Sequence, residues 1–313
     1  MSGTSPGHTP LQADAALARW AGVDRLWVKR EDLNPTGSHK DRGAARQIAA
    51  CQERGHAVAV ISSSGNAALA AAARGSIAGV TVVALLSPLT EPARAAAIRA
   101  AGGRVVVTTK PINFTLRLSR VCGWPDLRPS QSVEALEGFA GLGEELAVEL
   151  AEGVALLGYA SSGTTFQAVG AALREAGRGL PLHPVQAGLV NGLSREFGRP
   201  GDGRRSLVGD LGVKVSARAG EVVDLVRRSG GEAWWVDDAS IAEAGQALRA
   251  SGHAVAPECW AALAGLRMAA REDAVREACL LLTGRAVVDP SAPRLELPLA
   301  TFAGVLDSLE DLR

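Results

Sequence analysis

The chain has 313 residues, enough for a large buried core, and this length favours two domains over one. Lysine plus arginine and aspartate plus glutamate each number 33, so the formal net charge is zero. Proteins that bind nucleic acid or membrane surfaces normally carry a basic excess, so we expect neither partner. Only 4% of the residues are aromatic, and the abundance of Ala and Gly suits helices packed closely on a parallel sheet.

The N-terminus, Met1 to Gly7, is small and polar and does not resemble a signal peptide. No apolar run is long enough to cross a bilayer. The cysteines are widely spaced, without a C-x-x-C pair or a neighbouring cluster of metal ligands, at Cys51, Cys122, Cys259 and Cys279. We therefore expect a soluble, cytoplasmic protein with reduced thiols and no metal site.

Short β-branched runs alternate with longer stretches rich in Ala, Leu, Glu and Arg. The expected strands, in chain order, are Leu26–Lys29, Val58–Ser62, Val80–Leu86, Val105–Thr108, Val154–Tyr159, His183–Ala187, Trp234–Asp237 and Cys279–Thr283. The expected helices are Asp41–Arg54, Ala67–Gly75, Pro92–Ala101, Ala135–Ala151, Thr165–Ala176, Ile241–Ser251 and Cys259–Ala270. This alternation predicts an α/β fold with crossover units and parallel sheets. We expect residues 46–135 to form a small domain and residues 1–45 plus 136–313 to form a large one.

The most informative segment leads from the first strand into a helix and contains Lys40. A turn built on Asn34-Pro35-Thr36-Gly37 follows the strand, and Ser38 is a candidate N-cap with Asp41 three residues later. Lys40 then lies in the first helical turn, where the helix dipole disfavours a cation and favours the neutral amine that a nucleophilic lysine needs. A solvated lysine at a helix start is the alternative reading of this local pattern.

The ten residues Asn-Pro-Thr-Gly-Ser-His-Lys-Asp-Arg-Gly, ending at Gly43, closely resemble the lysine segment of threonine synthases. These enzymes belong to the tryptophan-synthase-β-like, or fold-type II, family that uses pyridoxal 5′-phosphate (PLP). The resemblance implies that Lys40 carries PLP as a Schiff base and later moves protons. It also implies two three-layer α/β/α domains with mainly parallel sheets, the smaller one mobile and inserted in the larger.

A second segment supplies a candidate site for the cofactor phosphate. Small hydroxyl residues and glycine lie between an expected strand and helix, at Ser161, Ser162, Gly163, Thr164 and Thr165. Such a turn presents free N–H groups and the positive end of a helix to an anion. A plain helix cap is the alternative, but the position resembles the phosphate loop of the family, although threonine synthases usually have more Gly and Asn there.

A third segment has the same physical character and begins the Ala-rich helix after the second strand. It contains Ser63, Ser64, Gly65 and Asn66. The resemblance implies that this turn binds the substrate carboxylate through serine and backbone N–H groups. It also implies that Asn66 hydrogen-bonds the ring hydroxyl of PLP. A simple serine cap is the alternative reading.

The last segment, Leu280 to Gly284, is an apolar run with a hydroxyl at Thr283. It resembles the family segment in which threonine faces the pyridine nitrogen, although an ordinary strand end is the alternative. A neutral hydroxyl cannot hold that nitrogen protonated as a carboxylate would. The family uses such a cofactor for elimination and replacement at Cβ or Cγ rather than for transamination.

The sequence departs from the threonine synthase pattern in the later part of the chain. These enzymes usually carry Glu before the Pro that begins a late helix, whereas Ala256 precedes Pro257 here and Glu258 is shifted by two. Arg285-Ala286 stands where His-Gly is usual. These differences bear on the substrate more than on the class of chemistry.

The substrate of threonine synthase, O-phosphohomoserine, brings a second phosphate that needs its own basic clamp. Arg94 stands where the family has a lysine, and Lys110 and Arg285 are further candidates. Each of the three is otherwise an ordinary surface charge.

The residues and the resemblance together predict a PLP-dependent lyase of amino-acid metabolism that acts on a small amino acid, with a homodimer as the expected assembly. The leading reaction is the conversion of O-phosphohomoserine to threonine and phosphate. A serine/threonine dehydratase and a cysteine-synthase-like β-replacement enzyme are the alternatives within the class. A catalytically idle protein that binds PLP or an amino acid is the alternative outside it. A nucleotide-binding α/β protein would need a G-x-G-x-x-G turn or a Walker lysine motif, and the sequence has neither.

Overall fold

The computed structural model describes residues 5–63, 65–209, 218–287 and 291–313. The chain forms two compact units. The small unit consists mainly of Lys40–Gly138 and Val287–Arg313, and the large unit consists of Gly7–His39 and Phe139–Ala286. Compared with the boundaries expected from sequence, the main difference is that Val287–Arg313 groups with the small unit. The mobility of the small domain stays a prediction.

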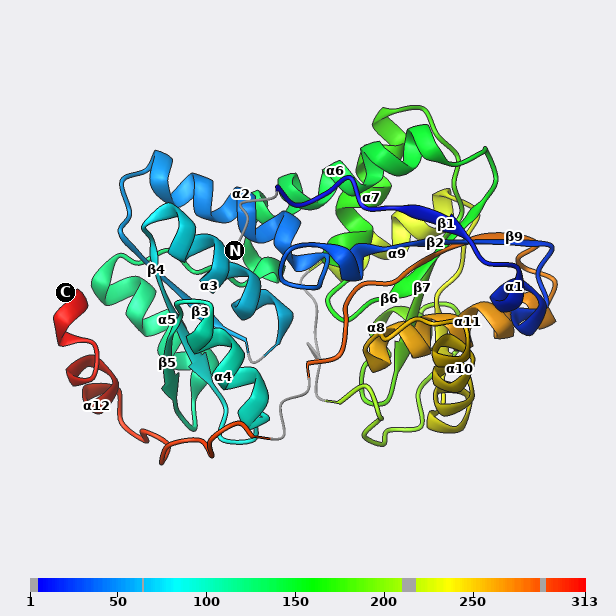
Figure 1. Ribbon diagram of the computed structural model, residues 1–313. Helices are drawn as coiled ribbons and strands as arrows, with labels where there is room; N and C mark the ends of the chain where they lie inside the picture. The colour runs from blue at the N-terminus through cyan, green and yellow to red at the C-terminus, as the bar shows by residue number, and fades with distance from the viewer. Residues whose placement is uncertain (1–4, 64, 210–217, 288–290) are drawn as a thin grey trace. The chain divides into compact units, whose positions relative to one another are not determined.

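The large unit is built on a six-stranded sheet (Figure 1). Its order is β1 (Leu11–Ala13), β2 (Arg25–Lys29), β9 (Glu277–Leu281), β6 (Ala155–Tyr159), β7 (Leu182–Ala187) and β8 (Trp234–Val236). Only the β1–β2 pair is antiparallel. The central strands β6, β7 and β9 are almost entirely buried, as parallel strands covered by helices on both faces must be.

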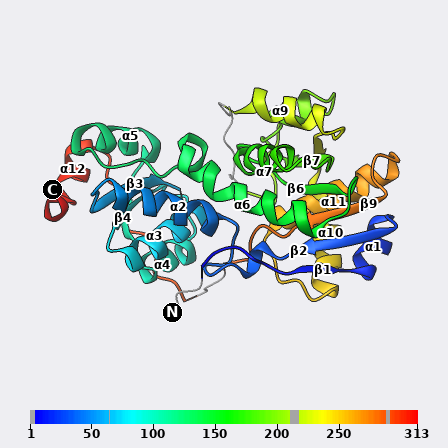
Figure 2. The same ribbon diagram turned by 90° about the horizontal axis from the view of Figure 1, so that it is seen from above.

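Helices cover both faces of this sheet (Figure 2). One hydrophobic core lies under α1 (Ala15–Ala21), α10 (Asp238–Ala250) and α11 (Pro257–Arg271). A second core lies on the opposite face under α6 (Val133–Glu149), α7 (Thr164–Glu175) and α9 (Ala219–Arg228), with the short α8 (Gly192–Arg195) beside them. The large unit is therefore a three-layer sandwich.

The small unit repeats this plan around the parallel sheet β3 (Val58–Ser62), β4 (Thr81–Leu86) and β5 (Arg104–Val107). One face packs on α2 (Lys40–Glu53), α3 (Asn66–Ala78) and α4 (Pro92–Ala100). The other face packs on α5 (Pro111–Cys122) and the C-terminal α12 (Phe302–Asp307). Leu299 forms a bridge to Thr108, so the C-terminal segment extends this unit at the end of β5.

The mixed α/β fold with mainly parallel sheets confirms the fold predicted from sequence. Each of the eight expected strands is present within two residues of its expected ends. Two element ends differ from expectation. Helix α2 begins at Lys40, one residue before its expected start, and Ser38 forms an antiparallel bridge to Gly284. Strand β9 ends at Leu281, which places Thr283 in the segment after the strand.

No helix among the described residues is long and apolar enough to span a membrane. The same part of the chain contains no group of three or more metal-ligating side chains that could hold an ion. The four cysteines are free thiols, as expected.

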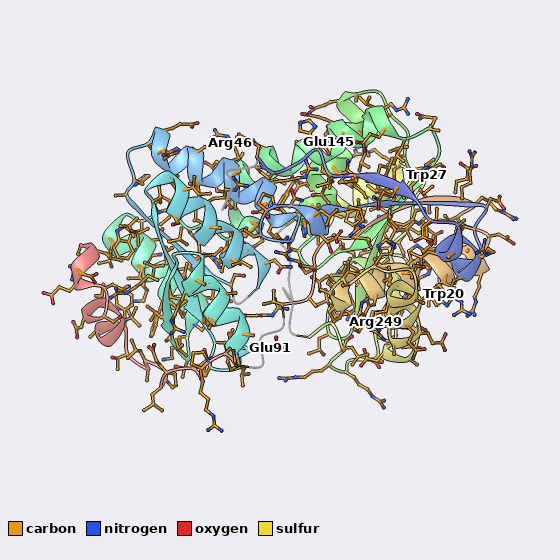
Figure 3. All side chains as sticks on the ribbon, in the orientation of Figure 1. Trp20, Trp27, Arg46, Glu91, Glu145 and Arg249 are labelled. Atoms are coloured by element: carbon orange, nitrogen blue, oxygen red, sulfur yellow. The ribbon has the colours of Figure 1, made fainter. Side chains whose placement is uncertain are left out.

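A buried lysine ties β2 to α6 in the large unit. The side chain of Lys29 is fully buried, and its Nζ lies 2.9 Å from Glu145 Oε2 and 2.7 Å from Glu149 Oε2. It also donates to the carbonyl oxygen of Thr9 at 2.8 Å. Figure 3 labels Glu145 on α6. This cluster fixes the strand that leads directly into the Lys40 segment.

A buried imidazole makes the stability of the large unit sensitive to pH. Trp234 Nε1 donates to His183 Nδ1 at 3.0 Å, and burial followed by the charge of Arg199 lowers the pKa of His183 to about 4. The unfolded chain takes up this proton near the ordinary value, about 6.5. As the pH falls from 6.5 toward 4, the free energy of unfolding therefore decreases by on the order of 3 kcal/mol.

We expect the imidazole resonances of His183 in the folded protein to titrate well below pH 6, as followed by NMR. Urea unfolding between pH 7 and pH 4 should show the matching loss of stability, reduced in His183→Phe. A His183 midpoint near 6.5 in the folded protein would contradict the expectation.

Candidate active site

The carboxyl ends of β6 and β9 bring two of the predicted cofactor segments to the same edge of one sheet. The two strands are neighbours and run parallel, with Leu156 opposite Cys279 and Leu157 opposite Leu280. The Ser161–Thr165 turn follows β6 directly, and Thr283 follows β9 by two residues. Ligands of open α/β sheets bind outside the carboxyl ends of the strands, so this edge is the candidate site in the large unit.

The Ser161–Thr165 turn has the features of an anion site. Gly163 is the N-cap of α7 and has a φ of 78°, and a Cβ there would lie 2.8 Å from Val222 Cγ2. Gly163 has no side chain with which to cap α7, and the Thr164 N–H donates to Ser162 Oγ at 3.5 Å, while Ser162 Oγ and Thr164 Oγ1 lie 2.8 Å apart. The positive end of this twelve-residue helix and the hydroxyls beside it suit an anionic ligand.

The segment before Lys40 is paired with the segment around Thr283. The His39 N–H donates to the Thr283 carbonyl oxygen at 3.0 Å, and His39 Nδ1 lies 3.0 Å from the same oxygen. Ser38 and Gly284 form an antiparallel bridge, and the Arg285 N–H donates to the carbonyl oxygen of Gly37. Lys40 is the next residue along the chain, so its backbone starts from a point fixed against β9.

Gly37 allows this pairing for a steric reason. Its φ is 89°, in the left-handed region that favours glycine, and a Cβ at this position would overlap the side chain of Arg285. The turn before Lys40 therefore requires glycine at this position.

The remaining predicted residues lie in the small unit, at the starts of two neighbouring helices. Lys40 is the first residue of α2 and is partly buried, and Asn66 is the first residue of α3. Gly65 is the N-cap of α3 without a side-chain cap, and its N–H donates to Ser63 Oγ at 3.3 Å. Ser64 lies outside the described residues. The buried Asp41 Oδ1 and Arg74 Nε are 4.0 Å apart and join α2 to α3.

The three residues proposed to bind the substrate phosphate are Arg94, Lys110 and Arg285. Arg94 Nε lies 3.4 Å from Glu91 Oε2, one helical turn away, and Lys110 is exposed before α5. Arg285 is exposed beside Gly37 in the large unit. The roles of these three residues in substrate binding stay predictions.

Three residues near the end of β9 were not singled out from sequence. His39 pairs with Thr283 as described above, and Cys259 Sγ lies 3.7 Å from Thr283 Oγ1. Tyr159, the only tyrosine in the chain, ends β6, and burial followed by the charge of Glu258 raises its pKa. The rarity of tyrosine was a signal in the sequence, whereas the other two depend on contacts between distant segments.

Burial governs the ionisation of Cys259. Desolvation, followed by the charge of Glu258, raises the pKa of this thiol to about 12. The thiol therefore remains protonated at neutral pH.

These features fit a cofactor with a phosphate group and an aromatic nitrogen. The start of α7 offers hydroxyls and the positive end of a helix, and the buried hydroxyl of Thr283 lies on the same edge of the sheet. This edge is therefore the candidate cofactor site of the large unit.

Comparisons with known proteins agree with such a cofactor. The family described as "Pyridoxal-phosphate dependent enzyme" matches residues 4–284, and the chain belongs to it. Membership implies pyridoxal 5′-phosphate as the cofactor.

Among individual relatives, a threonine synthase from Methanosarcina acetivorans is 42% identical over 80 residues, which are 26% of this chain and 20% of that protein. Cysteine synthase B from Salmonella typhimurium is 34% identical over 108 residues, which are 33% of this chain and 35% of that protein. These matches thus span only a fifth to about a third of the relatives. A threonine deaminase from Solanum lycopersicum shares the fold, with a TM-score of 0.77 and 18% identity, over 97% of this chain and 84% of that one.

Proposed function

We propose that this protein is a PLP-dependent lyase that catalyses elimination or replacement on a small amino acid with a leaving group at Cβ or Cγ. Threonine synthase-like conversion of O-phosphohomoserine to threonine and phosphate is the leading reaction. The observation that carries the proposal is the pairing of His39 with Thr283 on the edge that also holds the phosphate-type turn. It anchors the chain immediately before the one lysine that begins α2.

Four segments of the chain would hold the cofactor. The N–H groups and hydroxyls of Ser161, Ser162, Gly163, Thr164 and Thr165 would bind its phosphate. The Thr283 hydroxyl would face the ring nitrogen, and Asn66 would bind the ring hydroxyl. Lys40 would bond to its aldehyde carbon.

The chain's own residues would then divide the work of the reaction. When bound, PLP supplies an aldehyde that condenses with amines and a ring that accepts electron density from Cα. Ser63, Ser64, Gly65 and Asn66 would bind the substrate carboxylate and fix its orientation. The Lys40 amine would take the proton from Cα as a general base.

Thr283 would set the type of reaction. A neutral hydroxyl donates or accepts one hydrogen bond but does not stabilise a protonated ring nitrogen as a carboxylate does. This environment favours elimination and replacement over transamination. The segment 34–43 and the Leu-Thr-Gly segment support threonine synthase within the class, while Ala256 and Arg285 keep the dehydratase and β-replacement alternatives open.

We expect purified, PLP-loaded protein to turn over O-phosphohomoserine faster than threonine or O-acetylserine. Release of phosphate, a 2-oxoacid or acetate, respectively, distinguishes the three substrates, and Lys40→Ala is the control. Faster formation of a 2-oxoacid from threonine would make the protein a dehydratase. A protein that binds PLP but turns over none of the three would instead fit an amino-acid sensor or partner subunit.

We also propose a cytoplasmic homodimer. Size-exclusion chromatography with light scattering would test the assembly. A monomer at working concentrations would contradict it.

A further inference from the structure

The hydroxyl of Thr283 lies within hydrogen-bonding distance of the buried sulfur of Cys259. Both side chains are buried, Thr283 at 4% and Cys259 at 0% exposure. Cys259 Sγ lies 3.7 Å from Thr283 Oγ1 and 3.4 Å from the carbonyl oxygen of Gly284. Among the described residues, Cys259 is the hydrogen-bonding neighbour of the Thr283 hydroxyl.

The start of α11 holds this sulfur in place. The Ala256 N–H donates to the Gly284 carbonyl oxygen at 2.9 Å, and Val255 forms an antiparallel bridge to Arg285. Pro257 then begins the helix with its φ already fixed. The segment after β9 is thus clamped to the helix that carries Cys259.

The single proton of the thiol decides what the Thr283 hydroxyl can do. Because Cys259 stays protonated, its one proton can be donated either to the Gly284 carbonyl oxygen or to Thr283 Oγ1. When the S–H donates to Thr283 Oγ1, that oxygen is the acceptor, and its own hydrogen points away from the sulfur. The hydroxyl hydrogen is then available to an acceptor such as a pyridine nitrogen.

We propose that Cys259 is a positioning residue that orients the Thr283 hydroxyl toward the ring nitrogen of the cofactor. The proposal rests on the proposed function, because it needs PLP bound at this edge of the sheet. It predicts that removing the thiol alters the hydrogen bond at the ring nitrogen while Lys40 still binds the aldehyde carbon.

The test uses the whole protein loaded with PLP that is labelled with ¹⁵N at the ring nitrogen. We expect Cys259→Ala to shift the ¹⁵N resonance in the same direction as Thr283→Val and to raise the PLP dissociation constant by about fivefold, the value of one ordinary hydrogen bond. Cys279→Ala is the matched control. Cys279 is equally buried on β9, but it packs in the core on the other face of the sheet. It should leave the resonance unchanged.

The double variant separates positioning from general packing. In the Thr283→Val background, Cys259→Ala should produce no further ¹⁵N shift, because the hydroxyl on which it acts is gone. An unshifted resonance in Cys259→Ala, or an equal shift in both backgrounds, would overturn the role of Cys259. If wild-type protein forms no covalent linkage to PLP, the proposed function itself fails, and this outcome is distinguishable from the other two.

Discussion

Lys40→Ala is expected to lose the visible absorbance of lysine-linked PLP and to lower turnover by about 10⁴-fold, because the substituted chain lacks both the nucleophile for the cofactor and the base for the Cα proton. Lys40 is the first residue of α2, where a cation gains nothing from the helix dipole. Circular dichroism of the apoprotein would check that the variant still folds.

Borohydride reduction followed by peptide mass spectrometry gives a direct readout of the linkage. The chain has lysines only at positions 29, 40, 110 and 214, so the modified peptide is easily assigned. Lys110→Ala is the matched control, because Lys110 is exposed before α5. A cofactor label on any peptide other than that of Lys40 would refute the assignment.

Much of the fold could be predicted because strands such as β3, β4 and β5 are local runs of mainly apolar residues. Val58–Ser62 was predicted with both ends correct, since its β-branched residues are followed at once by small turn residues. The three-residue β1 and the helices α1, α5, α8, α9 and α12 were missed. Strand β1 exists because it pairs with β2, and its own short sequence carries no period from which to predict it.

The parts of the candidate site that are contiguous in the sequence could be predicted. The contacts that the fold makes between distant segments could not. The hydroxyl-rich turn of Ser161–Thr165 shows its chemistry within five residues. The bonds of Thr283 to His39 and Cys259 join segments that lie 244 and 24 residues apart. No local period or propensity encodes such pairings, because they follow from which strands become neighbours in the sheet.

The second large effect concerns stability rather than chemistry. We expect Lys29→Met to lower the free energy of unfolding by about 3 kcal/mol, because it leaves the carboxylates of Glu145 and Glu149 beside an apolar side chain. The lysine is fully buried, whereas Glu145 is 12% and Glu149 is 32% exposed, so water recovers part of the lost interaction. Urea unfolding at neutral pH would measure the change.

Methionine preserves most of the volume of Lys29, so the effect of charge is separated from that of a cavity. Adding Glu145→Gln to Lys29→Met should restore part of the stability, because one stranded carboxylate is removed. The exposed Lys110→Met should change stability by less than about 0.5 kcal/mol. Lys29 ends β2, and the chain leads from it into the Lys40 segment. Weaker PLP binding should therefore accompany the loss of stability. Unchanged stability in Lys29→Met would show that this buried ion-pair cluster does not hold β2 against α6.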